Sequence, residues 1–262
     1  MTSRALLVLC ACAASGCVAD APKEIDALLH YIWDEFDSSP AVIDGAVMNL
    51  HAALGGDDLA SRKEGELRDL EQAEIAELPV TRIGAPNASD ASGFFMGRKL
   101  TCDFLQLEKI SYWLDQKSLY NDDYEKYARV HTSSLDAYLQ RQTDTLTWDS
   151  MYTTKISTAT FDAKNTNSMR YLTGPSGLGP VLLRRSWLPE AAGASGGSFD
   201  QDYQLEIYYR RGDGAIVHAY GVWRDMTVGG ITDDQDFFAS VMIDQMDKWD
   251  SKTETLCKEG RP

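Results

Sequence analysis

The stretch that decides the fold is residues 203–226, YQLEIYYRRGDGAIVHAYGVWRDM. Its two halves, 203–210 and 215–226, are rich in aromatic and β-branched residues, which favour strands. Between them stands Arg210-Arg211-Gly212-Asp213-Gly214, whose Asp-Gly pair supplies the positive φ angles that tight hairpin turns need. The sequence therefore predicts a β-hairpin over these residues.

Alternation divides the side chains of the first half between the two faces of the predicted sheet. One face carries Tyr203, Leu205, Ile207 and Tyr209, and the other carries Gln204, Glu206, Tyr208 and Arg210. The simplest interpretation of the second set is a solvated face. The alternative is an inward face, where polar groups must be hydrogen-bonded or meet a ligand or water.

The period of two residues begins near Trp148 and extends on both sides of the hairpin. It predicts further strands over residues 152–161, 169–172 and 181–188. A long helix is predicted after residue 232, because Thr232-Asp233-Asp234-Gln235 has the form of a capping box. Its apolar stripe, which would pack on a sheet, is Phe238, Val241, Met242, Met246, Trp249 and Leu256.

The first half of the chain reads mainly as helices. Pro40 suits the first turn of one of them. We predict helices over 25–36, 40–54, 104–114 and 124–142, short strands over 78–83 and 94–100, and a charged, solvated helix or loop over 59–76.

This order of elements resembles the helix-grip fold of START and Bet v 1-like proteins. The resemblance covers residues 78–258 and rests on element order, with no shared sequence motif. It implies an α+β fold in which an antiparallel sheet of five to seven strands packs on a long C-terminal helix, with a hydrophobic ligand between them. We expect residues 59–262 to form this domain, with residues 17–58 as a lipidated N-terminus and helical extension. The family has no shared catalytic residues to carry over.

The N-terminus has the three-part pattern of a secretory signal, with Arg4 followed by a short apolar run and small residues. The run of about ten residues is shorter than the roughly 20 that cross a bilayer. Ala14-Ser15-Gly16-Cys17 resembles the lipobox of bacterial lipoproteins, although Ala14 stands where Leu is usual. The resemblance implies removal of residues 1–16 and lipidation of Cys17. The alternatives are cleavage without a lipid and a retained N-terminal helix.

The expected location is the cell envelope. Val18-Ala19, with no Asp directly after Cys17, resembles lipoproteins sent to an outer membrane, which predicts its periplasmic face or the cell surface. The formal net charge is −15 and becomes more negative when the leader, with its single arginine, is removed. Such a surface repels nucleic acid and anionic lipid headgroups, so the acyl chains alone must attach the protein to a membrane.

Two cysteines remain once Cys10 and Cys12 leave with the leader and Cys17 is acylated. In an oxidising compartment Cys102 and Cys257 are expected to pair, the alternative being two separately buried thiols. Such a bridge closes a long loop and would stabilise the fold by about 4 to 5 kcal/mol.

No motif of catalysis or of cofactor binding is found, and the four histidines lack metal-ligand spacing. We therefore expect a non-enzymatic protein without metal or cofactor that binds a lipid or hydrophobic small molecule. One alternative is a solid-core scaffold that holds a protein partner, of unknown identity, through its acidic surface, and another is a hydrolase with an unfamiliar acidic site. The candidate ligand contacts, taken from strands with polar tips and from the last helix, are Arg184, His218, Tyr220, Trp223, Met242 and Trp249.

Overall fold

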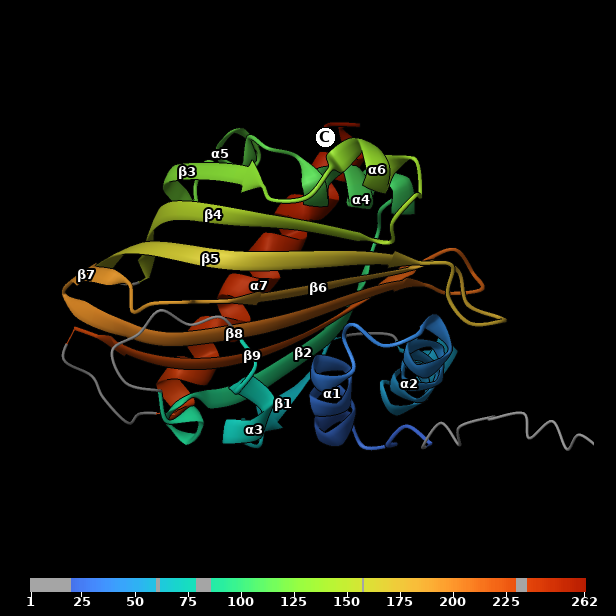
Figure 1. Ribbon diagram of the computed structural model, residues 1–262, viewed down its shortest axis with the longest axis horizontal. Coiled ribbons are helices and arrows are strands. Elements are labelled where there is room, and N and C mark those ends of the chain that lie inside the picture. The colour runs from blue at the N-terminus through green and yellow to red at the C-terminus, as the bar shows by residue number, and fades with distance from the viewer. Residues whose placement is uncertain (1–19, 60–61, 79–85, 157, 230–234) are drawn as a thin grey trace, which may run out of the picture.

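The computed structural model describes residues 20–59, 62–78, 86–156, 158–229 and 235–262 (Figure 1). The predicted leader with Cys17, Thr232 to Asp234 of the predicted capping box, and almost all of the predicted strand 78–83 lie outside these residues.

The fold is α+β and is built on one antiparallel sheet of nine strands, more than the five to seven expected. Neighbouring strands follow the order β1-β2-β9-β8-β6-β5-β4-β3, and β7 pairs with β5 off this path. The strands are β1 Lys63–Leu67, β2 Ser92–Leu100, β3 Tyr124–His131, β4 Thr145–Ile156, β5 Ala159–Leu172, β6 Val181–Trp187, β7 Gly193–Ser195, β8 Gly197–Arg210 and β9 Ile216–Val228.

The described helices range from single turns to one of 24 residues. They are α1 Ile25–Asp34, α2 Pro40–Ala53, α3 Gln72–Ile75, α4 Phe104–Tyr112, α5 Gln116–Leu119, α6 Leu135–Leu139 and α7 Gln235–Lys258, with 3-10 turns η1 Gly56–Asp58 and η2 Ala88–Asp90. No helix among the described residues is long and apolar enough to cross a membrane.

The long helix α7 crosses the strands on one side of the sheet (Figure 1). Its stripe packs as predicted: Met242 joins a core cluster with Phe199 and Val222, and Leu256 joins another with Tyr120. The predicted packing of a C-terminal helix on an antiparallel sheet is confirmed.

The opposite face of the sheet is covered by α1 and α2, which share one hydrophobic core with it. Trp33 of α1 and Leu50 of α2 are fully buried with Tyr203 and Ile207 of β8. Burial of a large apolar side chain contributes about 1.5–3 kcal/mol, so these helices hold firmly to the sheet. The sheet is therefore covered on both faces.

The predicted hairpin joins β8 and β9. The amide of Arg211 donates to the carbonyl of Ala215 at 2.8 Å, and the amide of Gly214 donates to the carbonyl of Arg211 at 3.0 Å. Of the Asp-Gly pair only Gly214 has a positive φ, of 89°. Asp213 instead supports the turn through its carboxylate, which accepts from the amide of Ala215 at 3.0 Å.

Three predicted elements are wrong in part. Residues 124–142 form β3 and the short helix α6, because pairing of β3 with β4 outweighs the helical spacing of Tyr127 and Val130. The predicted strand 152–161 instead comprises the end of β4 and the start of β5, which pair through Ile156 and Ala159. The charged stretch 59–76 contains β1, which pairs with β2 along the edge of the sheet, and α3.

Candidate functional site

A cavity of about 610 Å³ lies between α7 and the sheet. Side chains from β3, β4, β5, β6, β8 and β9 line it on one side and α7 lines it on the other. The exposed lining residues Asp122, Lys155, Asp244 and Lys248 mark where it meets solvent.

The sheet side of the cavity is a row of polar side chains. Strand register places Arg129 beside Ser150 and Ser150 beside Asn165. Further along, Arg184 stands beside Glu206. These residues come from five neighbouring strands, so only the assembled sheet brings them together.

The prediction that Gln204, Glu206 and Tyr208 lie on a solvated face is wrong. Gln204 and Glu206 line the cavity, and Glu206 and Tyr208 are only 9 % and 2 % exposed. Of that set Arg210 alone is exposed. The polar face of β8 is covered because α7 lies over it, which the alternation of one strand does not reveal.

The row ends at an ion pair between β6 and β8. Nη1 of Arg184 donates to Oε2 of Glu206 at 2.9 Å, and the hydroxyl of Tyr208 donates to the same oxygen at 2.6 Å. Burial lowers the pKa of Arg184, but Glu206 and the neighbouring tyrosines together outweigh it, so the pKa is raised. Burial and the charge of Glu206 both raise the pKa of Tyr208. Arg184 therefore stays cationic and Tyr208 stays neutral.

His218 connects this pair to α7. Its Nδ1 lies 2.9 Å from Oδ1 of Asp250, and its ring stacks on Tyr208 with the centroids 4.0 Å apart. Nε2 of His218 lies 3.7 Å from Oε2 of Glu206 and has no hydrogen-bond partner among the described residues. Because Asp250 holds Nδ1, the second ring nitrogen is left to meet a ligand or water.

A second ion pair lies beside the first. Nε of Arg224 donates to Oδ1 of Asp202 at 2.8 Å, and the hydroxyl of Tyr220 donates to the amide oxygen of Gln204 at 2.6 Å. Burial lowers the pKa of Arg224, but Asp202 and the neighbouring Tyr220 and Tyr152 together outweigh it, so the pKa is raised.

The remaining wall of the cavity is apolar or aromatic. It consists of Ile156, Phe199, Val241, Met242, Met246 and Trp249, with the rings of Tyr124, Tyr127 and Tyr152. The cavity is thus amphipathic, where the helix-grip resemblance had implied a hydrophobic one.

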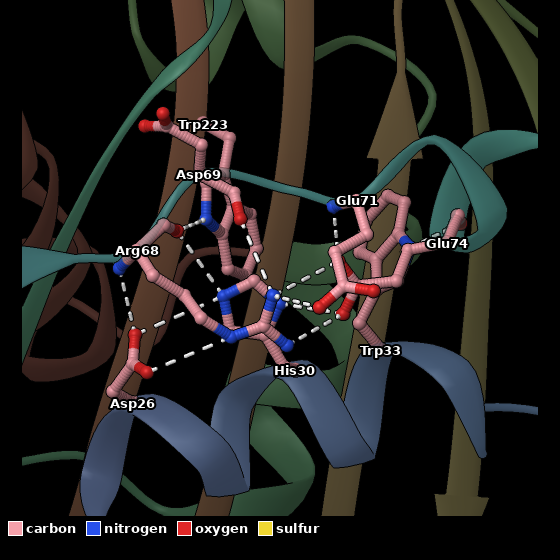
Figure 2. Close-up of polar contacts among 8 residues, drawn as sticks. All are labelled: Asp26, His30, Trp33, Arg68, Asp69, Glu71, Glu74 and Trp223. Atoms are coloured by element: carbon pink, nitrogen blue, oxygen red, sulfur yellow. Dashed lines mark hydrogen bonds and ion pairs between the residues drawn. The ribbon is translucent and has the colours of Figure 1, made fainter. Parts of the chain in front are cut away.

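Five of the six candidate ligand contacts, Arg184, His218, Tyr220, Met242 and Trp249, line the cavity. Trp223 does not, because strand alternation turns it away from His218 and Tyr220. It packs against His30 and Trp33 of α1, and its indole Nε1 donates to the carbonyl of Arg68 at 2.9 Å (Figure 2). The assignment of Trp223 to the ligand site is therefore corrected.

The sequence does not predict several of the cavity residues. The predicted helix 124–142 contains Arg129, Tyr124 and Tyr127, and Asn165 and Asn167 lie in a stretch with no predicted strand. Tyr127 and Arg129 alternate with exposed Ala128 and Val130, and that period of two residues is the signal that could have found them.

The predicted pairing of Cys102 with Cys257 is confirmed, with a Cα–Cα distance of 5.3 Å. The bridge ties the segment before α4 to the last turn of α7. Among the described residues, no three or more His, Cys, Asp or Glu side chains are grouped so as to hold a metal ion.

No protein-family model matches the sequence, and no curated protein matches it. Similar solved structures include human StAR-related lipid transfer protein 5, at 9 % identity and a TM-score of 0.45, covering 86 % of this chain and 99 % of that one. Another is a fragment of the STAR-related lipid transfer protein of Xanthomonas axonopodis, at 10 % identity and a TM-score of 0.41, covering 79 % and 97 %. A third is a START superfamily protein of Mycobacterium smegmatis, at 5 % identity and a TM-score of 0.41, covering 64 % and 97 %. All three TM-scores are below 0.5, so no ligand of this chain is inferred from these proteins.

Proposed function

We propose that this chain is an envelope lipoprotein, anchored through Cys17, whose domain binds an amphipathic lipid or small molecule between α7 and the sheet. The observation that carries the proposal is a cavity with an apolar wall and a polar floor whose hydrogen-bonding groups are not all paired. The polar floor is the row of polar side chains on the sheet side of the cavity, from Arg129 to Glu206, together with His218. Nε of Arg184 and Nε2 of His218 are buried without hydrogen-bond partners among the described residues. Buried polar atoms of this kind are normally satisfied by a ligand or by ordered water.

The size of the cavity supports a small-molecule ligand. Its volume of about 610 Å³ falls within the range of about 300–1,000 Å³ that is usual for such sites. A solid-core scaffold, one alternative drawn from the sequence, has no need of such a space. We therefore place the proposed binding site in the cavity and not on the acidic surface.

The proposed anchor and the proposed site fit one another. A lipid on Cys17 would hold the domain beside a bilayer, where an amphipathic molecule is available. We propose binding rather than catalysis, because the buried ion pairs of Arg184 with Glu206 and of Arg224 with Asp202 are used to hold the polar floor in place.

The test is to isolate the full chain from membranes in mild detergent and analyse it by native mass spectrometry and organic extraction. We expect a small molecule to co-purify. Ser150→Phe, which fills the polar floor where Ser150 is 4 % exposed, should reduce its amount. Met151→Phe is the matched control, because Met151 lies on the same strand and is 52 % exposed. No bound molecule in the wild type, or equal amounts in both variants, would overturn the proposal.

A further inference from the structure

Three guanidinium groups line the cavity, and two of them have carboxylate partners. Arg184 pairs with Glu206 and Arg224 pairs with Asp202. Arg129 makes no ion pair within 4.0 Å with any carboxylate of the described residues. One of the three cavity guanidiniums therefore has no carboxylate partner among the described residues, in a chain whose formal net charge is −15.

The side chain of Arg129 is fixed by neutral groups. Nη1 donates to the carbonyl of Ser111 at 2.6 Å, and Nε donates to the hydroxyl of Tyr127 at 3.1 Å. The guanidinium carbon lies 4.4 Å from the centroid of the Trp148 ring. These contacts hold the guanidinium in place without neutralising its charge.

A second cation stands close by. The guanidinium carbon of Arg184 lies 5.9 Å from the centroid of the same Trp148 ring, so the two arginines stand near one indole. Burial lowers the pKa of Arg129, and the charge of Arg184 lowers it further. Among the described residues, Glu206 is thus the one carboxylate that pairs with either Arg129 or Arg184.

The other charged lining residues do not offset this charge. Asp122, Asp244, Lys155 and Lys248 are exposed and Asp123 is half-buried, so water screens them at the solvent end of the cavity. A half-buried guanidinium beside an apolar wall is best satisfied by an anion that can accept two of its N–H groups.

We propose that the ligand is an anionic amphiphile whose carboxylate or phosphate binds Arg129, while its apolar part lies along the α7 side of the cavity. This inference rests on the proposed function and specifies its ligand class. Arg129 selects for charge, and Met242, Met246 and Trp249 supply the apolar contact.

The test is titration calorimetry of the full chain in zwitterionic nanodiscs, with empty nanodiscs as the blank. The probes are octanoate, octyl phosphate, uncharged 1-octanol and inorganic phosphate. Charge-assisted hydrogen bonds predict that octanoate and octyl phosphate bind about tenfold or more tightly than 1-octanol. Arg129→Gln should weaken octanoate binding by about the same factor and change 1-octanol binding less than about twofold.

Two further variants separate the charge of Arg129 from its packing. Arg129→Lys keeps the charge and should retain part of the preference for octanoate. Arg62→Gln removes an exposed arginine outside the cavity and should bind every probe as the wild type does. Thermal unfolding of each variant checks that it is folded, and the ratio of octanoate to 1-octanol affinity in the wild type needs no variant.

Equal binding of octanoate and 1-octanol by the wild type, or unchanged octanoate binding by a folded Arg129→Gln, would overturn the anion preference and leave the proposed function intact. Failure of every alkyl probe to bind would overturn both. Inorganic phosphate binding as tightly as octyl phosphate would support an anion site for a free ion and contradict a lipid ligand.

Discussion

His30 fastens α1 to the chain segment that follows β1 (Figure 2). Its Nδ1 lies 2.6 Å from Oε1 of Glu74, and its Nε2 lies 3.2 Å from the carbonyl oxygen of Arg68. Trp33, one turn further along α1, donates from Nε1 to the carbonyl of Glu74 at 3.0 Å. Because His30 and Glu74 are both buried, breaking this pair leaves a polar group without a partner.

The electrostatics of Glu74 make this contact sensitive to acid. Burial raises the pKa of Glu74, but hydrogen bonds from His30 and the Glu71 amide, with the charges of His30 and Arg68, outweigh it and lower the pKa below its usual value. A lowered folded-state pKa means that the stabilisation is complete above the unfolded-state pKa of about 4.3. It is lost as the pH falls through the folded-state value.

We therefore predict that Glu74→Gln lowers the free energy of unfolding by about 1–3 kcal/mol at pH 7. The difference from the wild type should shrink as the pH falls from 5 toward 3. Urea unfolding at several pH values measures both effects. Glu66→Gln, at an exposed position on β1, is the control and should follow the wild type throughout. A difference for Glu74→Gln that does not change with pH would contradict the assignment.

At the scale of elements, the sequence predicted those whose patterns are local. The hairpin of β8 and β9, the helices α1 and α2, and the long helix α7 are all formed close to the expected residues. Strand β3 was not found, because its aromatic residues also satisfy helical spacing and because its partner β4 begins 14 residues after it ends. Whether such a segment forms a strand or a helix depends on its contacts with other strands.

The disulfide acts at this scale because it fixes one end of α7. Around it Trp249 stacks on Tyr120 with the centroids 3.7 Å apart, and the Tyr120 hydroxyl lies 2.9 Å from Oγ1 of Thr253. The bridge spans a sequence separation of 155 residues, so in the loop-entropy model it restricts the unfolded chain strongly and contributes about 4 to 5 kcal/mol.

We predict that the double variant Cys102→Ser/Cys257→Ser loses up to about 4 to 5 kcal/mol of unfolding free energy. Urea unfolding with and without reductant measures it, and intact mass should differ by two hydrogens between reduced and unreduced wild type. Reductant should destabilise the wild type and leave the double variant unchanged. Labelling of both thiols in unreduced protein would contradict the pairing.

At the scale of the whole molecule, the sheet separates two environments. Its α1 and α2 side packs into an apolar core, whereas its α7 side encloses the amphipathic cavity. The helical extension predicted from the sequence, α1 and α2, thus packs on one face of the sheet, and the other face lines the cavity.

Membrane attachment also belongs to the whole molecule. The net charge of −15 repels anionic lipid headgroups, so attachment is expected to depend on acyl chains at Cys17. We predict that labelled palmitate is incorporated into the wild type and lost in Cys17→Ala, with the variant moving to the soluble fraction. Cys12→Ala, within the apolar run of the leader, is the control and should keep the label. Label retained by Cys17→Ala would contradict the anchor.

The sequence by itself determined the helices and strands whose formation depends on residues close together in the chain. It also determined the properties that depend on composition alone, such as the number of cysteines. Periodicity and turn chemistry placed α1, α2, α7 and the β8–β9 hairpin, and the count of cysteines paired Cys102 with Cys257. These features follow from local backbone preferences and from covalent chemistry, which a single chain displays along its length.

Only the tertiary structure decided which polar face is buried. Alternation sorted Glu206 and His218 from Ile207 and Trp223, but it could not say that α7 covers the first set while α1 and α2 cover the second. Burial depends on which elements pack on each face, and that depends on contacts between residues far apart in the chain. The same contacts brought Arg129 of β3 and Arg184 of β6 to one indole ring, that of Trp148, and Arg129 carries the charge that the ligand is proposed to meet.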